Sequence, residues 1–253
     1  MPFFDLLIPP GLDAGITIAL LLTSVIASFI TIAFGIGGGV LLLAVIASLI
    51  PPAALIPVHG VVQMGSNFGR LALMFRYVNW QPMLAFGAGS VVGVLVGGAI
   101  SFNLSPALVQ AGVGFFVLWS IFRKPPRWMS GLPVVSGAIS SFLTMLFGAT
   151  GPFVATFTKS LALDRHRHVA THAAFMTVQH LLKTLMFGFL GFAFGPWIGF
   201  IGAMIVAGAI GTLLGRLVLD RMTDHRFRIA LDIVLGLLAI RLIWSGLHDL
   251  WAR

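Results

Sequence analysis

The sequence contains no cysteine and no glutamate, and its seven acidic residues are all aspartates. The absence of cysteine excludes disulfide bonds and thiol chemistry. Charged residues make up only 9% of the chain, whereas a soluble domain carries roughly 25%. Hydrophobic residues reach 58%, and apolar runs recur at about the 20-residue length that an α-helix needs to cross a bilayer. The composition therefore predicts an all-α polytopic membrane protein in contact with the lipid bilayer.

The net charge of +8 does not require a nucleic-acid partner. Arginines in short loops on one side of a membrane are what the positive-inside rule predicts. The N-terminal segment lacks a basic n-region and a small-residue cleavage site, so we expect no cleaved signal peptide.

The hydrophobic segments fall into two halves of five, and the second segment of each half is short. In the first half they are predicted at 15–34, 40–50, 53–75, 82–102 and 105–122. In the second half they are predicted at 132–147, 153–163, 169–192, 196–219 and 227–247. The expected organisation is an N-terminal extension at 1–14, a first transmembrane repeat at 15–123, a cytoplasmic linker at 124–130 and a second repeat at 131–253.

The two halves can be aligned with each other. At an offset of 113 residues, glycines and polar positions coincide: Gly38 with Gly151, His59 with His172, and Arg70 with Lys183. After a short slip the offset becomes 118 residues, and further glycines coincide. Because each half has an odd number of segments, the second must enter the membrane from the opposite face. The sequence predicts two inverted-topology repeats, as in many secondary transporters.

Charge predicts the orientation. If the N-terminus is outside, the loop cations share one side of the membrane: Arg76, Arg123, Lys124, Arg127, Arg165, Arg167, Arg221, Arg226 and Arg228. The loops at 51–52, 103–104, 148–152 and 193–195 carry no lysine or arginine. Both termini are therefore predicted outside, in a multi-pass protein of the bacterial cell (inner) membrane.

A helix breaker separates the first two segments of each half, FGIGGGV at 34–40 and FGATGPF at 147–153. The helices that follow are about 16 Å long, too short to cross a bilayer. If they begin inside the membrane, their first N–H groups and positive dipole ends form an anion site. We therefore predict substrate contacts at Gly37, Gly38, Gly39, Thr150 and Gly151. Close helix packing is the competing explanation of the glycines.

Polar residues recur on one face of the third segment of each half. The first stripe consists of His59, Gln63, Ser66, Asn67 and Arg70. The second consists of His172, Met176, Gln179, His180 and Lys183. Because unpaired polar groups are costly in a bilayer, both stripes should face the protein interior. We predict that all of them except Met176 bind the substrate. Interhelical hydrogen bonding and snorkelling of the two cations is the alternative.

The missing acids also limit ion coupling. Without a buried carboxylate, histidine is the only internal group that titrates near neutral pH. Proton coupling through His59, His172 or His180 stays open, as do uniport and a homodimer.

The breaks and stripes resemble those of the sulfite exporter TauE/SafE family of bacterial membrane carriers. In the first half the resemblance lies in FGIGGGVLLLAVIASLIPPAALIPVHGVVQMGSNFGRLALMFRYVNW. In the second half it lies in GAISSFLTMLFGATGPFVATFTKSLALDRHRHVATH. The resemblance implies a secondary transporter, with no enzymatic activity and no cofactor. It also implies a small sulfur-containing anion such as sulfite or an organosulfonate as substrate, with export as the expected direction.

The main alternative is a membrane-embedded metalloprotein or metal-ion carrier. His168 and His172 lie at i, i+4, a geometry that can bind Zn or Fe. Against this, no carboxylate lies at a comparable depth, and we expect His166 and His168 in a basic loop that repels cations. A serine hydrolase built on Ser66 and His59 lacks a motif that would activate the nucleophile.

Overall fold

The computed structural model contains ten α-helices and two short 3-10 helices, and no strand, among the residues that it describes. These are residues 7–9, 11–34, 37–101, 104–123, 131–148, 150–218 and 225–251. The predicted linker at 124–130 and part of the N-terminal extension lie outside them. The predicted all-α class is confirmed for the described chain.

The ten α-helices correspond one to one with the predicted hydrophobic segments. The first half forms α2 (Ala14–Phe34), α3 (Gly38–Leu49), α4 (Pro52–Met74), α5 (Met83–Ser101) and α6 (Pro106–Phe122). The second half forms α7 (Pro133–Phe147), α8 (Gly151–Ser160), α9 (Arg165–Phe189), α10 (Ile198–Val218) and α11 (His225–Trp251). Proline stands in the first turn of α4, α6 and α7, where its fixed φ suits a helix start and its missing N–H leaves no donor unpaired.

The second helix of each half is short, as predicted: α3 has 12 residues and α8 has 10. One local prediction is wrong, because His166 and His168 lie in the first turns of α9 and not in a loop. The carboxylate of Asp164 accepts a hydrogen bond from the Arg167 backbone N–H at 3.0 Å. This N-cap satisfies one of the free donors at the helix start and lets α9 begin before the apolar run.

Four helices are long and apolar enough to cross a membrane: Ala14–Phe34, Met83–Ser101, Gly195–Val218 and Leu231–Trp251. Large apolar side chains on these helices point outward, among them Leu84, Leu217 and Trp244. The polar stripes of α4 and α9 are buried instead. An apolar exterior around a polar interior is the arrangement expected of a chain that lies in lipid.

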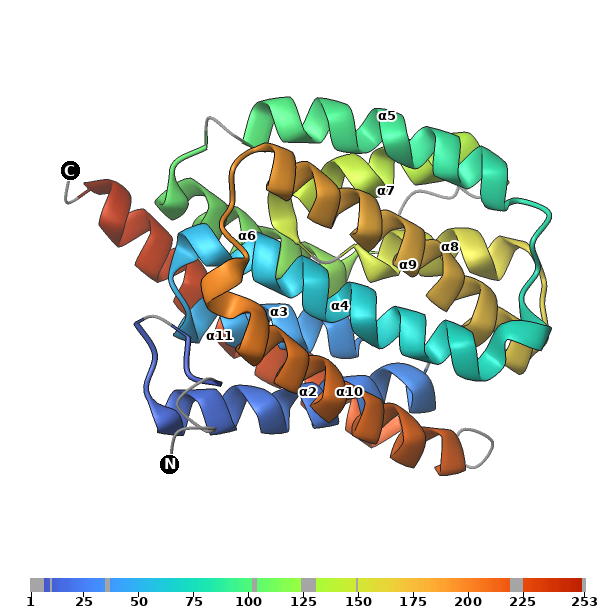
Figure 1. Ribbon diagram of the computed structural model, residues 1–253, viewed down its shortest axis with the longest axis horizontal. Helices are drawn as coiled ribbons and strands as arrows, with labels where there is room; N and C mark the ends of the chain where they lie inside the picture. The colour runs from blue at the N-terminus through green and yellow to red at the C-terminus, as the bar shows by residue number, and fades with distance from the viewer. Residues whose placement is uncertain are drawn as a thin grey trace.

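The helices pack in pairs around a central pair formed by α4 and α9. These two helices run side by side in opposite directions, with α5 and α7 on one flank and α2 and α10 on the other (Figure 1). The remaining large contact joins α6 to α11. The short helices α3 and α8 both pack against members of the central pair. Their starts are therefore brought to the polar face of α4 and α9.

Candidate functional site

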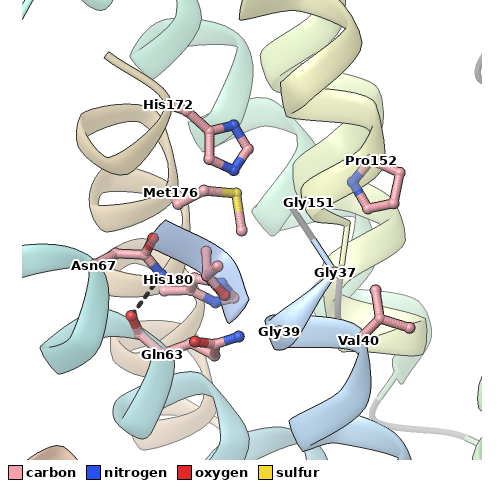
Figure 2. A pocket seen from close by; sticks show the side chains of 11 residues that line it. Gly37, Gly39, Val40, Gln63, Asn67, Gly151, Pro152, His172, Met176 and His180 are labelled. Atoms are coloured by element: carbon pink, nitrogen blue, oxygen red, sulfur yellow. Dashed lines mark hydrogen bonds between the residues drawn. The ribbon is translucent and has the colours of Figure 1, made fainter. Parts of the chain in front are cut away.

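A small cavity lies where the starts of α3 and α8 meet the polar face of the α4–α9 pair (Figure 2). Its volume of about 30 Å³ holds only one or two water molecules. Both halves of the chain contribute to its wall, which consists of Thr31, Gly37, Gly39, Val40, Gln63, Asn67, Gly151, Pro152, His172, Met176 and His180. The wall contains amides, imidazoles and helix starts, and it contains no carboxylate.

Two helix N-termini therefore open onto one cavity. Gly37 precedes α3 with a φ of 108°, a left-handed conformation that glycine adopts without steric cost. Gly151 begins α8 after Thr150. The first N–H groups of an α-helix have no acceptor in a preceding turn, and the aligned peptide dipoles add partial positive charge there. At α8 the donors are few, because Pro152 has no N–H and the N–H of Phe153 donates to the Thr150 carbonyl oxygen. This arrangement suits an anion bound between the two helix starts.

The α4 wall of the cavity is held by a hydrogen-bond chain. The Asn67 side-chain amide donates to the Gln63 carbonyl oxygen at 2.7 Å, and the Arg70 guanidinium donates to the Asn67 Oδ1 at 2.9 Å. Arg70 also donates to the Ser66 hydroxyl at 3.2 Å, and this hydroxyl lies 3.0 Å from that of Ser28 on α2. Arg70 is buried behind the wall and does not line the cavity. Its charge orients Asn67, whose amide does reach the cavity.

The α9 wall presents two histidines with unpaired nitrogens. His180 is fully buried, and within the described residues neither of its ring nitrogens has a hydrogen-bond partner. The Nδ1 of His172 is unpaired as well. His59 on α4 lies behind His180, with ring centroids 6.0 Å apart, and its Nε2 lies 3.2 Å from the Gly39 carbonyl oxygen. Because a carbonyl can only accept, this contact assigns the proton of a neutral His59 to Nε2.

Lys183 binds the backbone at the break between α7 and α8. Its ammonium donates to the Gly148 carbonyl oxygen at 3.0 Å and lies 3.4 Å from the Thr144 hydroxyl, at the end of α7. At the end of α2, Arg165 donates to the Ala33 carbonyl oxygen at 2.8 Å. Both cations therefore stand where helix carbonyls lack intrahelical donors and the dipole is negative.

Gln179 links three helices behind the cavity. The Thr150 hydroxyl donates to the Gln179 Oε1 at 3.2 Å, and the Gln179 amide donates to the Ser141 hydroxyl on α7 at 3.3 Å. Gln179 thus ties the start of α8 to α7 and α9. Its amide is used by the protein and is not presented to the cavity.

The structure divides the predicted site residues into two groups. The cavity wall includes Gly37, Gly39, Gln63, Asn67, Gly151, His172 and His180. Behind or beside it lie Gly38, His59, Ser66, Arg70, Thr150, Gln179 and Lys183. The wall also includes residues that were not predicted to contact substrate: Thr31, Val40, Pro152 and Met176. Pro152 and Met176 stand inside the two sequence patterns, whereas Thr31 lies in an apolar helix and carries no signal of its own.

Gly38 and Gly151 differ although the alignment pairs them. A Cβ on Gly38 would collide with the Ala27 carbonyl oxygen of α2, and it would also crowd the Thr31 hydroxyl. A Cβ on Gly151 would meet no atom within 4 Å. Gly38 therefore permits close packing of α3 on α2, and Gly151 faces open space at the cavity.

The described residues offer no ligand set for a metal centre. The rings of His168 and His172 stack with centroids 6.4 Å apart. No group of three or more His, Cys, Asp or Glu side chains suited to a metal occurs in the described part of the chain. A histidine pair alone falls short of the four ligands of structural zinc and the three of catalytic zinc.

Taken with its apolar helices, the buried polar cavity defines a multi-pass α-helical membrane protein. A profile of the family described as "Sulfite exporter TauE/SafE" matches residues 20–242, nearly the whole chain. The chain belongs to this family of membrane transporters. No match was found among curated proteins or among solved structures.

Proposed function

We propose that the protein is a secondary transporter that exports small sulfur-containing oxyanions, such as sulfite or organosulfonates, with its binding site in the central cavity. The observation that carries the proposal is the convergence of two helix N-termini on a cavity without a carboxylate. Neutral amides and imidazoles complete the wall. An oxyanion is the ligand whose charge and acceptor oxygens match such donors.

We further infer that the two halves are inverted repeats related by a two-fold axis through the cavity. The helix pairs support this inference, because exchanging equivalent helices turns the α2–α10 pair into the α7–α5 pair. The α4–α9 and α6–α11 pairs each turn into themselves. Equivalent helices also run in opposite directions where Figure 1 shows them clearly, as α4 and α9 do.

Individual contacts support the same symmetry. Gly93 approaches the Ala138 carbonyl oxygen, and Gly211 approaches the Val25 carbonyl oxygen. Offsets of 118 and 113 residues convert the first contact into the second.

A similar correspondence holds for Gly97 beside the Phe142 carbonyl oxygen and Gly215 beside that of Phe29. The Ser28–Ser66 hydroxyl pair likewise corresponds to the Ser141–Gln179 pair. Packing conserved between the halves at this level of detail favours a common fold for both.

The size of the cavity supports alternating access as the mechanism. Most of the side chains that line the cavity are buried, and the volume admits water but no oxyanion of four or more heavy atoms. The halves must therefore move apart on one side to admit the substrate and on the other to release it, as inverted repeats allow.

The orientation with both termini outside is part of the proposal. The start of α2 and the end of α11 lie at one end of the molecule, and the end of α4 and the start of α9 lie at the other (Figure 1). Arg76 and Arg165 follow or begin these last two helices. Their position opposite the termini matches the positive-inside rule.

The test is binding and flux with the purified full chain. Sulfite or methanesulfonate should raise the melting temperature in detergent more than chloride does, and proteoliposomes loaded with sulfite should release it. Gln63→Met removes a cavity amide at nearly constant volume, and it should weaken binding about ten- to a hundredfold, the equivalent of a hydrogen bond to a charged group.

The matched control is Gln81→Met, an exposed glutamine in the turn before α5. It should bind as wild type does. If no oxyanion stabilises the wild-type protein and none crosses the bilayer, the proposed function is wrong.

A further inference from the structure

The two walls of the cavity differ at one pair of equivalent positions. Asn67 on α4 and His180 on α9 both line the cavity and lie 113 residues apart. The Asn67 side chain is held at both ends, because its Nδ2 donates to the Gln63 carbonyl oxygen and its Oδ1 accepts from Arg70. His180 has no partner at either nitrogen within the described chain. The α4 wall therefore contains a side chain that the protein itself holds in place, and the α9 wall contains an imidazole without a hydrogen-bond partner in the described chain.

An unpaired buried imidazole needs an explanation. A buried polar group without a hydrogen bond is destabilising, and most such groups in proteins have a partner. His180 lines the cavity together with Gly37 and Gly39 at the start of α3, and both of its ring nitrogens are buried without a partner in the described chain. A bound oxyanion there would accept a hydrogen bond from the ring, and the bond is stronger when the ring is an imidazolium.

We propose that His180 is the proton-carrying anion ligand of this site, so that one proton is taken up from solvent with each bound anion. The inference rests on the proposed function. The proton adds to the ring nitrogen lone pair, and the imidazolium donates it in a hydrogen bond to the anion oxygen. No covalent bond of the substrate breaks. A bound monoanion and the imidazolium of His180 together carry no net charge, and the proton returns to solvent when the anion leaves.

The titratable groups around His180 are imidazoles and cations, so none of them stabilises an imidazolium at this position. His59 from α4 faces it, but His59 is bonded to the Gly39 carbonyl and lies outside the cavity wall. Lys183 on the same helix is engaged at the end of α7. Arg70 is engaged by Asn67 and Ser66.

His172 is the other imidazole in the wall. The helices α2, α3 and α7 contain no titratable residue, and α8 carries only the exposed Lys159 near its end. With no carboxylate nearby, only the anion can offset a positive charge on His180.

The sign of the pH dependence follows. The anion stabilises the protonated form of His180, so binding takes up a proton and affinity falls as pH rises. For one linked proton the dissociation constant should increase up to about tenfold per pH unit across the range in which histidine titrates.

The experiment uses the full-length protein in detergent with methanesulfonate, whose own charge does not change in this range. Calorimetric titrations in buffers of different ionisation enthalpy count the protons taken up per anion. Wild type should take up about one. His180→Gln keeps a hydrogen-bonding side chain, and it should still bind, more weakly and without proton uptake. His248→Gln, at an exposed histidine of α11, should match wild type.

Wild-type binding without proton uptake would overturn the inference while leaving the proposed function intact. Loss of uptake in His59→Gln or His172→Gln, with uptake retained in His180→Gln, would overturn the assignment to His180. Absence of binding by wild type would instead overturn the proposed function. The wild-type proton count decides the question even if His180→Gln does not fold.

Discussion

Alanine should destabilise the protein at Gly38 but not at Gly151, although the two glycines begin equivalent helices. A Cβ at Gly38 meets the Ala27 carbonyl of α2, a backbone atom that cannot move aside by changing a rotamer. Overpacking of this kind destabilises by about 1–3 kcal/mol. At Gly151 nothing lies within 4 Å, so alanine should be neutral or stabilising by up to about 1 kcal/mol through the unfolded state.

The assay is the melting temperature of the purified variants in detergent, with methanesulfonate binding measured alongside. A larger side chain separates stability from function, because Gly151→Leu should enter the cavity and abolish binding while the protein stays folded. The matched control is Gly202→Leu, an exposed glycine of α10 that also has nothing within 4 Å. Equal melting temperatures of Gly38→Ala and Gly151→Ala, or wild-type binding by Gly151→Leu, would refute the reasoning.

Two further predictions concern topology and the support of the cavity wall. In a chain without cysteine, Gln81→Cys and Ala193→Cys should be labelled by an impermeant maleimide from opposite faces of the membrane, and labelling from one face would contradict the inverted repeats. Arg70→Gln should weaken methanesulfonate binding about tenfold. Asn67 then loses the hydrogen bond that Arg70 donates to its Oδ1, and the Asn67 amide is no longer held in position at the cavity. The exposed Arg216 of α10 provides the control, and equal binding by Arg70→Gln and Arg216→Gln would show that Arg70 has no such role.

Local patterns predicted the helices closely. Apolar runs, prolines in first turns and glycines between segments depend on interactions within a few residues, and these are readable in the sequence. The short α3 and α8 and their starts at the two breaks were predicted for this reason. The start of α9 was missed because its N-cap, Asp164, precedes a basic turn that reads as a loop.

Helical periodicity also placed the stripes of α4 and α9 on buried faces. Residues at i, i+4 and i+7 share one side of a helix whatever packs against it. Because a polar side chain without a hydrogen-bond partner is costly in lipid, that side of the helix must face the protein interior. From these two arguments a polar interior at the third segment of each half follows without coordinates.

What the sequence by itself determined is therefore the class of protein, the order of helices, the two breaks and the polar faces. Only the tertiary structure decided which polar groups face the cavity and which bind one another. Arg70 and Lys183 align in sequence, yet Arg70 holds Asn67 on its own helix and Lys183 reaches Gly148 directly after the end of α7. A long flexible side chain bonds whatever acceptor the packing of neighbouring helices brings within reach. That choice depends on contacts between residues distant in the chain, which no local pattern encodes.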